Sequence, residues 1–243
     1  MGEVPSAEPA APTPPEEPPA LAGEALRLLP VAGHLDAVIS VPLGTRGARP
    51  VLVATHGNYD KPEWQCEVWG EIVGGRGFVL CPRGVRRGDS PGRQDPRYEY
   101  ASNQALEREI DAGLAALKAA FPGRIAEGPV VLAGFSLGAI QGVAIATRRP
   151  NDFPRLVLIE GGDGWARVAA RSFHEGGGQR VLFACSQGGC LASANAAAAV
   201  LRRAGVEVAV EKGKNEGHTY VGEVRNKYAE RFPWLVEGDK RWE

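Results

Sequence analysis

The serine at position 136 stands in a sequence context that can make its hydroxyl a nucleophile. Ser136 is the centre of a Gly-x-Ser-x-Gly pattern at residues 134–138, which follows the apolar run 130–133 and precedes an apolar stretch at 139–146 typical of a helix. The two glycines allow a turn so tight that the serine takes a strained backbone conformation with its hydroxyl exposed. The amides at the start of the following helix face the same point. The pattern therefore predicts attack by Ser136 on a carbonyl group.

A second match to the same pattern, at residues 88–92, provides a control within the chain. Ser90 follows a basic segment that is no buried strand, and Pro91 favours an extended backbone over a strained turn. We therefore expect Ser90 to lie in a surface loop. The alternative for Ser136, a helix cap in a nucleotide-binding turn, requires further phosphate-binding glycines that this spacing does not supply.

Length and composition narrow the class of protein. The 243 residues are 44% hydrophobic, which is enough for one sizeable core, and the formal net charge is −1. Near neutrality gives no indication of nucleic-acid binding, and no stretch approaches the roughly 20 apolar residues of a membrane span. No cleavable signal is recognised either. We expect a disordered Pro-rich tether at residues 1–24 and a single catalytic domain at 25–243.

Four cysteines bear on the cellular compartment. Cys66, Cys81, Cys185 and Cys190 allow three disulfide pairings, and the sequence does not choose among them, although Cys185 and Cys190 bracket a short loop. Their spacing is not C-x-x-C and no histidine is near, so a zinc site is not expected. An even cysteine count behind a Pro-rich tether favours a periplasmic or extracellular protein, either free or tethered to the envelope, with a cytoplasmic location as the alternative.

Short apolar runs alternate with helical segments after residue 35. The runs are continuous rather than alternating, as expected for strands of a parallel sheet that is covered on both faces. The predicted fold is therefore α/β, a doubly wound, mostly parallel sheet flanked by helices. The predicted strands are 36–42, 51–55, 77–81, 130–135, 155–160, 180–185 and 206–210, and the predicted helices are 63–75, 103–120 (with Asn103 as a candidate cap), 138–149, 191–204 and 221–236.

Three motifs carry a resemblance to a known superfamily. They are His56-Gly57-Asn58 after one predicted strand, the turn around Ser136 after a later one, and Gly217-His218 after the last. From about residue 35 onward the chain resembles the α/β-hydrolase superfamily. Its small esterase branches, dienelactone-hydrolase-like or polyhydroxybutyrate-depolymerase-like, are the most similar. The resemblance implies a serine esterase and leaves the substrate open.

His218 is the predicted general base among the four histidines. It follows the final predicted strand, at the edge of the sheet where the Ser136 turn also opens. The resemblance places the histidine last in chain order in the same way. His34 precedes the core and His174 lies in a Gly-rich segment, so both are expected at the surface. We interpret His56 as a structural residue that braces its own loop.

Two amides are needed to bind the oxyanion. The resemblance assigns one to Leu137, directly after the nucleophile. It assigns the other to the loop after the strand that ends at Thr55, which makes Asn58 the candidate and Tyr59 its alternate.

The acid of a triad is the point at which the sequence departs from the common pattern. Such hydrolases usually carry an aspartate after the penultimate strand, but no Asp or Glu occurs from Gly176 to Val206. Some lipase-type relatives draw the acid from the end of the strand before, where Glu160 and Asp163 stand. Glu160 is preferred because it lies at the predicted strand tip, whereas Asp163 lies between glycines. A serine–histidine dyad remains open.

Two features bear on the substrate. Few residues separate Glu160 from the next strand, so no large cap domain is expected and the site should be open. The segment after Pro82 is rich in arginine, and Arg83, Arg86 and Arg87 could meet an anionic group of the substrate. A locally ion-paired loop is the simpler interpretation of these arginines.

The sequence thus favours a serine hydrolase that cleaves small-molecule or polymeric carboxylic esters through an acyl-enzyme. It implies no metal or organic cofactor, no nucleic acid and no membrane span. Two alternatives remain open: a serine peptidase of the same fold, and a catalytically degenerate hydrolase fold that serves as a binding module. The second alternative is considered because no Asp or Glu follows the penultimate predicted strand, where such hydrolases usually carry the acid.

Overall fold

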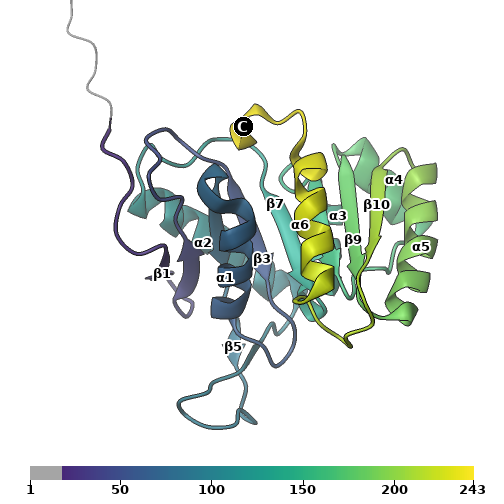
Figure 1. The fold of residues 1–243 in the computed structure, drawn as a ribbon, viewed down its shortest axis with the longest axis horizontal. Coiled ribbons are helices and arrows are strands. Elements are labelled where there is room, and N and C mark those ends of the chain that lie inside the picture. Colours follow the sequence, from purple (N-terminus) through teal and green to yellow (C-terminus); the bar gives the residue numbers. More distant parts are fainter. Residues whose placement is uncertain (1–17) are drawn as a thin grey trace, which may run out of the picture.

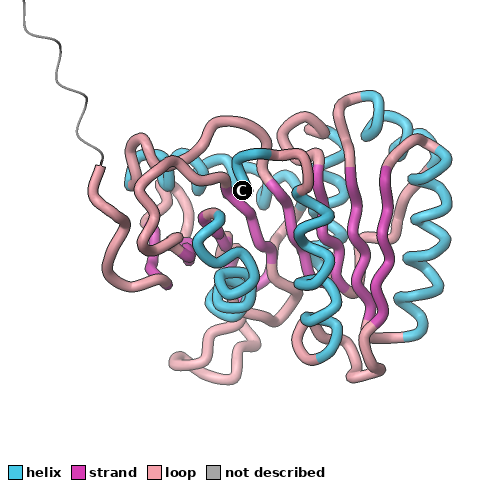
Figure 2. Tube along the Cα trace, turned by 45° about the horizontal axis from the view of Figure 1, so that its top comes forward, coloured by secondary structure: helices cyan, strands magenta, loops and turns pink. Residues whose placement is uncertain are grey.

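A computed structural model describes residues 18–243, in which an eight-stranded sheet lies between two layers of helices (Figures 1 and 2). The strand order is β1-β2-β4-β3-β7-β8-β9-β10. The strands are β1 Leu26–Leu29, β2 Ala37–Ser40, β3 Val51–Thr55, β4 Phe78–Cys81, β7 Val131–Phe135, β8 Arg155–Ile159, β9 Arg180–Cys185 and β10 Glu207–Lys212. The helices are α1 Pro62–Val73, α2 Asn103–Ala120, α3 Leu137–Arg148, α4 Arg167–Glu175, α5 Gly188–Arg203 and α6 Glu223–Val236.

The sheet is parallel from β4 to β10, and β2 pairs antiparallel with both of its neighbours, β1 and β4. All parallel strands therefore end at one edge, where the loops that follow β3, β7, β8, β9 and β10 meet. This arrangement confirms the predicted doubly wound sheet. The connection from β8 to β9 carries only the nine-residue helix α4, so it forms no large cap over that edge.

Each face of the sheet has its own core. Along β3, Val51 and Val53 pack in the core beneath α2, α3, α4 and α5, while Leu52 and Ala54 pack in the core beneath α1 and α6. Successive strand residues point to opposite faces, and here the side chains on both faces are buried. This explains why the predicted strands read as continuous apolar runs.

A long connection between β4 and α2 leaves the body of the molecule at the edge where the parallel strands end. We call residues 83–100 the arginine excursion; it contains the small hairpin of β5 Val85–Arg86 and β6 Tyr98–Glu99 and projects at the lower end of Figure 1. Ser90 lies within it, where its hydroxyl donates to the Arg87 carbonyl (2.7 Å) and accepts from the Arg97 amide (2.9 Å). The prediction of a loop position for Ser90 is confirmed.

Several local predictions were wrong or incomplete. The cap of α2 is Ser102 rather than Asn103, because the Ser102 hydroxyl accepts a hydrogen bond from the Ala105 amide at 3.1 Å. The strand β1 was missed because it is a short edge strand with three of its four residues at least partly exposed. Helix α4 was missed as well, and His174 lies in its last turn rather than in a loop, although it is exposed as expected.

The predicted tether lies mostly outside the described residues, since residues 1–17 are not among them. Within residues 18–24, Leu21 already joins the body of the protein: its amide donates to the Thr45 carbonyl (2.9 Å) and its carbonyl accepts from Gly44 (2.8 Å). At the other end, the short 3₁₀ helix η2 Lys240–Trp242 packs Trp242 edge-on against Phe232 of α6.

The four cysteines form two disulfides. Cys66 of α1 pairs with Cys81 of β4, and Cys185 at the end of β9 pairs with Cys190 in the first turn of α5. The first disulfide ties a helix to the sheet inside the core. The second closes a loop at the edge where the parallel strands end.

We expect two glycines of α3 to respond oppositely to alanine. A Cβ at Gly138 would lie 2.6 Å from the Thr55 carbonyl oxygen, whereas one at Gly142 would meet nothing closer than a Leu132 methyl at 3.4 Å. Gly138→Ala should lower the free energy of unfolding by about 1–3 kcal/mol. Gly142→Ala should be neutral or raise it by up to about 1 kcal/mol, because alanine restricts the unfolded chain. Urea denaturation of both variants measures the difference, and equal stabilities would contradict this account of the turn.

Candidate functional site

Ser136 occupies a strained turn between β7 and α3. Its φ of 51° lies in the left-handed region that non-glycine residues rarely adopt, and it is the residue directly before the first turn of α3. Its amide donates to the Ile159 carbonyl at 2.9 Å, which extends the pairing of β7 with β8 beyond the strands. At Gly134, a Cβ would lie 2.6 Å from the Ala139 amide nitrogen, so the turn requires glycine there. The strand–turn–helix context predicted for Ser136 is confirmed.

The loop after β3 packs directly against this turn. A Cβ at Gly57 would lie 2.8 Å from the Phe135 ring and 3.3 Å from the Ser136 Cβ. Asn58 and Tyr59 follow at once, and Tyr59 has a positive φ of 61°. The Leu137 amide begins α3 and so has no carbonyl partner within the helix. The structure therefore brings both predicted oxyanion elements to the side of the Ser136 turn.

His218 lies beside the same turn. Its imidazole stands over the Phe135 ring, with the ring centroids 4.9 Å apart. Nδ1 of His218 lies 3.3 Å from Oε2 of Glu160, which leaves Nε2 on the opposite side of the ring. The His218 side chain is 48% exposed, so the site is open to solvent.

Glu160 is the carboxylate that reaches His218. It stands at the tip of β8 with a φ of 51°, and its side chain is only 1% exposed. Its Oε1 accepts two hydrogen bonds, from the amides of Ser186 (2.5 Å) and Gln187 (2.8 Å). A buried carboxylate needs such donors to offset its lost hydration. Asp163, the alternate acid, is exposed in the following loop.

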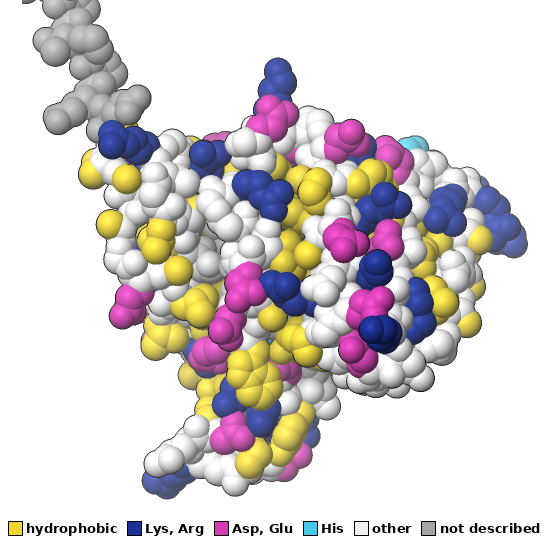
Figure 3. Space-filling model, viewed as in Figure 1, with side chains coloured by type: hydrophobic (Ala, Val, Ile, Leu, Met, Phe, Trp, Pro, Cys, Tyr) yellow, Lys and Arg dark blue, Asp and Glu magenta, His cyan; other side chains and the backbone are white. Residues whose placement is uncertain are grey.

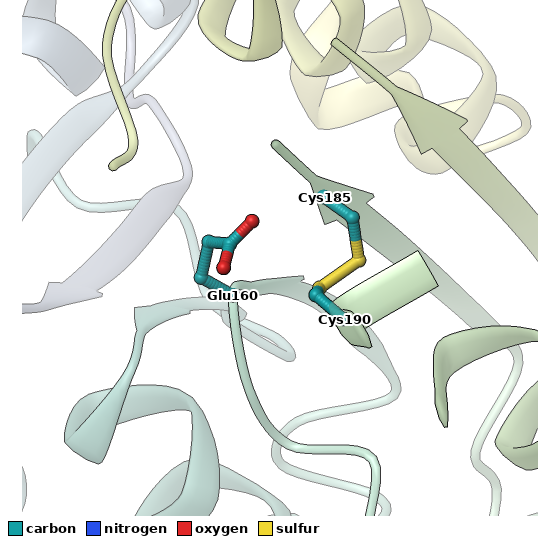
Figure 4. A group of neighbouring side chains, drawn as sticks. All are labelled: Glu160, Cys185 and Cys190. Carbon is teal, nitrogen blue, oxygen red and sulfur yellow. A yellow bond between two sulfur atoms is a disulfide. The ribbon is translucent and has the colours of Figure 1, made fainter. Parts of the chain in front are cut away.

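The amides that bind Glu160 belong to the loop closed by the second disulfide. Figure 4 shows the Glu160 carboxylate beside the bond between Cys185 and Cys190. One ligand atom from each of these three residues lies within 4.8 Å of the others, a grouping that could hold a metal ion. Because both sulfurs are joined in a disulfide, neither is a thiolate, and only the carboxylate oxygen of this group keeps its full ability to bind a metal ion.

Ser186 connects this loop with the segment that carries His218. Its buried hydroxyl donates to the Lys214 carbonyl (2.7 Å) and accepts from the Glu216 amide (2.9 Å). One residue therefore orients the Glu160 carboxylate through its backbone and the His218 segment through its side chain. This role was not predictable from the sequence, because a serine after a strand is common in any loop.

Asp60 connects two further segments of the site, the loop after β3 and the segment that follows His218. Its carboxylate accepts from the amides of Gly57 (3.3 Å) and Lys61 (2.8 Å) and from the Tyr220 hydroxyl (3.4 Å). Burial, together with the nearby Asp60 charge, raises the pKa of Tyr220, so its phenol stays protonated and donates. Tyr220 also packs edge-on against Phe135, with centroids 4.7 Å apart. Neither Asp60 nor Tyr220 was predicted from the sequence.

The remaining histidines lie apart from this chemistry. His34 is exposed, as expected. His56 is fully buried: Nδ1 faces the Gly57 carbonyl (2.7 Å), Nε2 faces the Arg83 carbonyl (2.9 Å), and the ring stacks on Tyr100 with centroids 4.4 Å apart. These contacts join the loop after β3 to the start of the arginine excursion, which agrees with the structural role expected for His56.

The arginines considered for an anionic substrate group mostly have partners within the protein. Arg83 is buried, pairs with Glu63 at 2.7 Å and donates to the Asp36 carbonyl at 2.6 Å. Arg87 pairs with carboxylates of the excursion itself, and Arg86 is exposed. Figure 3 shows basic, acidic and apolar side chains intermixed over this lower end of the molecule. The simpler interpretation, a locally ion-paired loop, describes Arg87, whereas Arg83 pairs with Glu63 of α1, outside the loop.

Comparison with solved structures finds the same architecture. Over 81% of this chain and 97% of the other, the crystal structure of esterase PE8 matches with a TM-score of 0.59 and 16% sequence identity. A Bacillus cereus carboxylesterase matches 84% of this chain and 96% of its own, with a TM-score of 0.55 and 20% identity. Poly(aspartic acid) hydrolase-1 from Sphingomonas sp. KT-1 matches 90% of this chain and 100% of its own, with a TM-score of 0.60 and 14% identity.

At these low identities the likeness concerns the fold. No family model matches the chain, and no curated protein matches it in sequence. None of the helices formed by residues 18–243 has the length and apolar character required to span a membrane.

We predict that the two disulfides contribute differently to stability and to turnover. In the chain-entropy model, loss of the 15-residue link between Cys66 and Cys81 costs about 3 kcal/mol, and loss of the 5-residue link between Cys185 and Cys190 about 2 kcal/mol. Only the second link holds the amides that orient Glu160, so Cys185→Ala/Cys190→Ala should lower kcat by about tenfold.

The matched control is Cys66→Ala/Cys81→Ala, assayed for ester hydrolysis at a temperature where both variants remain folded. This control should be the less stable variant in urea and yet keep nearly its full kcat. The opposite ranking in kcat would contradict a role for the 185–190 loop in the site.

Proposed function

The chain has the α/β-hydrolase fold, and we propose that it is a serine hydrolase that cleaves carboxylic esters through an acyl-enzyme intermediate. The observation that carries this proposal is the contact between His218 Nδ1 and Glu160 Oε2 (3.3 Å), made beside the strained Ser136 turn. A buried carboxylate on one ring nitrogen fixes the imidazole and stabilises the imidazolium that forms when the other nitrogen takes a proton.

In the proposed mechanism, His218 Nε2 removes the proton from the Ser136 hydroxyl as its oxygen attacks the ester carbonyl. The Leu137 amide and an amide of the loop after β3, from Asn58 or alternatively Tyr59, donate to the oxyanion. The protonated His218 then gives its proton to the departing alkoxide, which leaves an ester bond between the acyl group and Ser136. A water molecule, deprotonated by His218, attacks that ester and releases the carboxylic acid.

The open site supports substrates whose ester bond is accessible. His218 is 48% exposed and the connection from β8 to β9 is short. A bulky or polymeric acyl group can therefore reach the site directly, because no cap in the described part of the chain covers it. Neighbours named as esterases agree with ester cleavage, while one neighbour is named as a hydrolase of poly(aspartic acid). The finer branch of the superfamily stays a hypothesis.

We also propose that the protein acts in an oxidising compartment, the periplasm or the extracellular space. Two disulfides among four cysteines support this, because disulfides are rare in reducing cytosol. Protein isolated without reductant should then show no free thiols on denaturing alkylation. Four reactive thiols would indicate the cytoplasmic alternative.

Ser136→Ala should abolish hydrolysis of an aryl ester, lowering kcat by about 10⁴-fold or more, because no covalent intermediate can form. It should equally abolish labelling by a fluorophosphonate probe. Ser90→Ala is the matched control, since Ser90 has the same flanking glycines and lies in the arginine excursion. If the Ser136 variant still took up the probe, the nucleophile would have been assigned wrongly.

Glu160→Gln should preserve the fold and lower kcat by about 10³-fold, since a neutral amide cannot stabilise the imidazolium on His218. The Gln oxygen can still accept from Ser186 and Gln187, so the site should not collapse. Asp163→Asn, in an exposed position, should change kcat by less than about twofold. Steady-state kinetics of the two variants and the wild type give the kcat values to be compared. Two mild effects would mean a serine–histidine dyad, and a larger effect at Asp163 would move the role there.

Ester and amide substrates with the same acyl group discriminate between esterase and peptidase. We expect the ester to be cleaved much faster, with a stoichiometric burst of aryl alcohol that marks the acyl-enzyme. Comparable rates for the amide would favour the peptidase. Absence of both burst and labelling in the wild type would favour a degenerate binding module.

A further inference from the structure

One guanidinium joins the arginine excursion to the loop after β3. Arg87 Nη1 donates to the side-chain oxygen of Asn58 at 2.8 Å and also to the Glu99 carboxylate. Its Nε and Nη2 form a two-point contact with the Asp89 carboxylate, each at 2.9 Å. All three nitrogens of Arg87 are therefore used within the protein, and one of them holds a residue of the proposed oxyanion loop.

The loop after β3 needs such external support because its own backbone is strained. Tyr59 has a φ of 61°, a conformation that costs about 1–3 kcal/mol in a non-glycine residue and persists only when neighbours impose it. The neighbours that reach Tyr59 come from the excursion: the Asp89 carbonyl accepts its hydroxyl at 3.1 Å, and the guanidiniums of Arg87 and Arg97 stand over its ring at 5.7 and 5.6 Å.

The excursion is itself fixed to the body of the protein. Arg83 and Gly84 begin the excursion, and their amides donate to the buried Glu109 carboxylate of α2 at 2.8 and 2.9 Å. Within it, the two arms are joined by the pairing of β5 with β6 and by the Arg87 amide, which donates to the Arg97 carbonyl at 2.8 Å. Arg87 thus transmits the position of an anchored segment to Asn58 and Tyr59.

We propose that Arg87 is a positioning residue of the ester hydrolysis: it holds the Asn58 side chain and the Tyr59 ring so that an amide of this loop points at the carbonyl oxygen of a substrate bound at Ser136. The inference rests on the proposed function, because it concerns an interaction made only with the developing oxyanion. Such an interaction affects kcat more than KM. Arg87 is not expected to bind an anionic substrate, since four of its five N–H groups already donate within the protein.

Arg87→Met tests this directly against Arg86→Met, a matched control at the adjacent and exposed arginine. Loss of a well-oriented oxyanion donor costs about 10²–10³ in kcat. A donor that is loosened rather than removed should cost less, and we expect Arg87→Met to lower kcat for a neutral aryl ester by about 10–100-fold. KM should stay within about twofold. Arg86→Met should change neither constant.

A double-mutant cycle with Asn58→Ala separates positioning from general loosening of the fold. Asn58→Ala keeps the backbone amide and removes only the oxygen that Arg87 holds, so it should lower kcat as well. If Arg87 acts through Asn58, the double variant should be little slower than the slower single variant, because the two substitutions break the same contact. If the reductions in kcat caused by Arg87→Met and Asn58→Ala multiply in the double variant, Arg87 does not act through Asn58.

The outcomes separate the inference from the function on which it rests. If the wild type neither hydrolyses the ester nor takes up the fluorophosphonate, the proposed function fails and the role of Arg87 falls with it. If the wild type is active and Arg87→Met matches Arg86→Met in kcat, only the role of Arg87 is overturned. A rise in KM confined to an ester that carries a carboxylate, with kcat unchanged, would instead make Arg87 a substrate-binding residue.

Discussion

The site depends on two adjacent strands that each end in a strained residue. Ser136 follows β7 and Glu160 follows β8, and both have a φ of 51°, where a side chain is unfavourable. Their backbones continue the sheet pairing for one residue, with Ser136 donating to Ile159 and Glu160 donating to Ala184. Both strained residues follow central strands whose side chains pack in a core on each face of the sheet. That packing holds the two backbones in conformations they would not adopt alone. Other parts of the site pack onto this pair of turns.

Much of this arrangement was predictable because the physical signals are local. Continuous apolar runs identify buried parallel strands, and glycines around Ser136 identify a turn that a larger residue would block. The sequence also narrowed the acid to Glu160 or Asp163, with a serine–histidine dyad as the alternative, since no Asp or Glu occurs from Gly176 to Val206. Rigidity at a strand tip favoured Glu160, and the structure joins that residue to His218.

The parts that were not predictable depend on contacts between distant segments. Asp60 meets Tyr220, and Ser186 meets Lys214, only because parallel strands bring their loops to one edge. The hydrophobic periodicity of the sequence does not indicate which residues of distant loops will meet. Helix α4 and strand β1 were missed for a different reason: both are short, and they lie at the margins of the cores. The excursion of residues 83–100 looked like a charged loop, and its charges pair mainly with one another.

The C-terminal residues have a consequence for how the molecule can be attached to a support. The Trp242 ring contacts the backbone at Gly77, just before β4, and Arg49 donates to the Glu243 carbonyl at 3.0 Å, so the last residues lie where parallel strands begin. Figure 1 shows this end of the chain opposite the arginine excursion. A linker joined at Glu243 would therefore leave the edge that carries Ser136 and His218 facing away from the support.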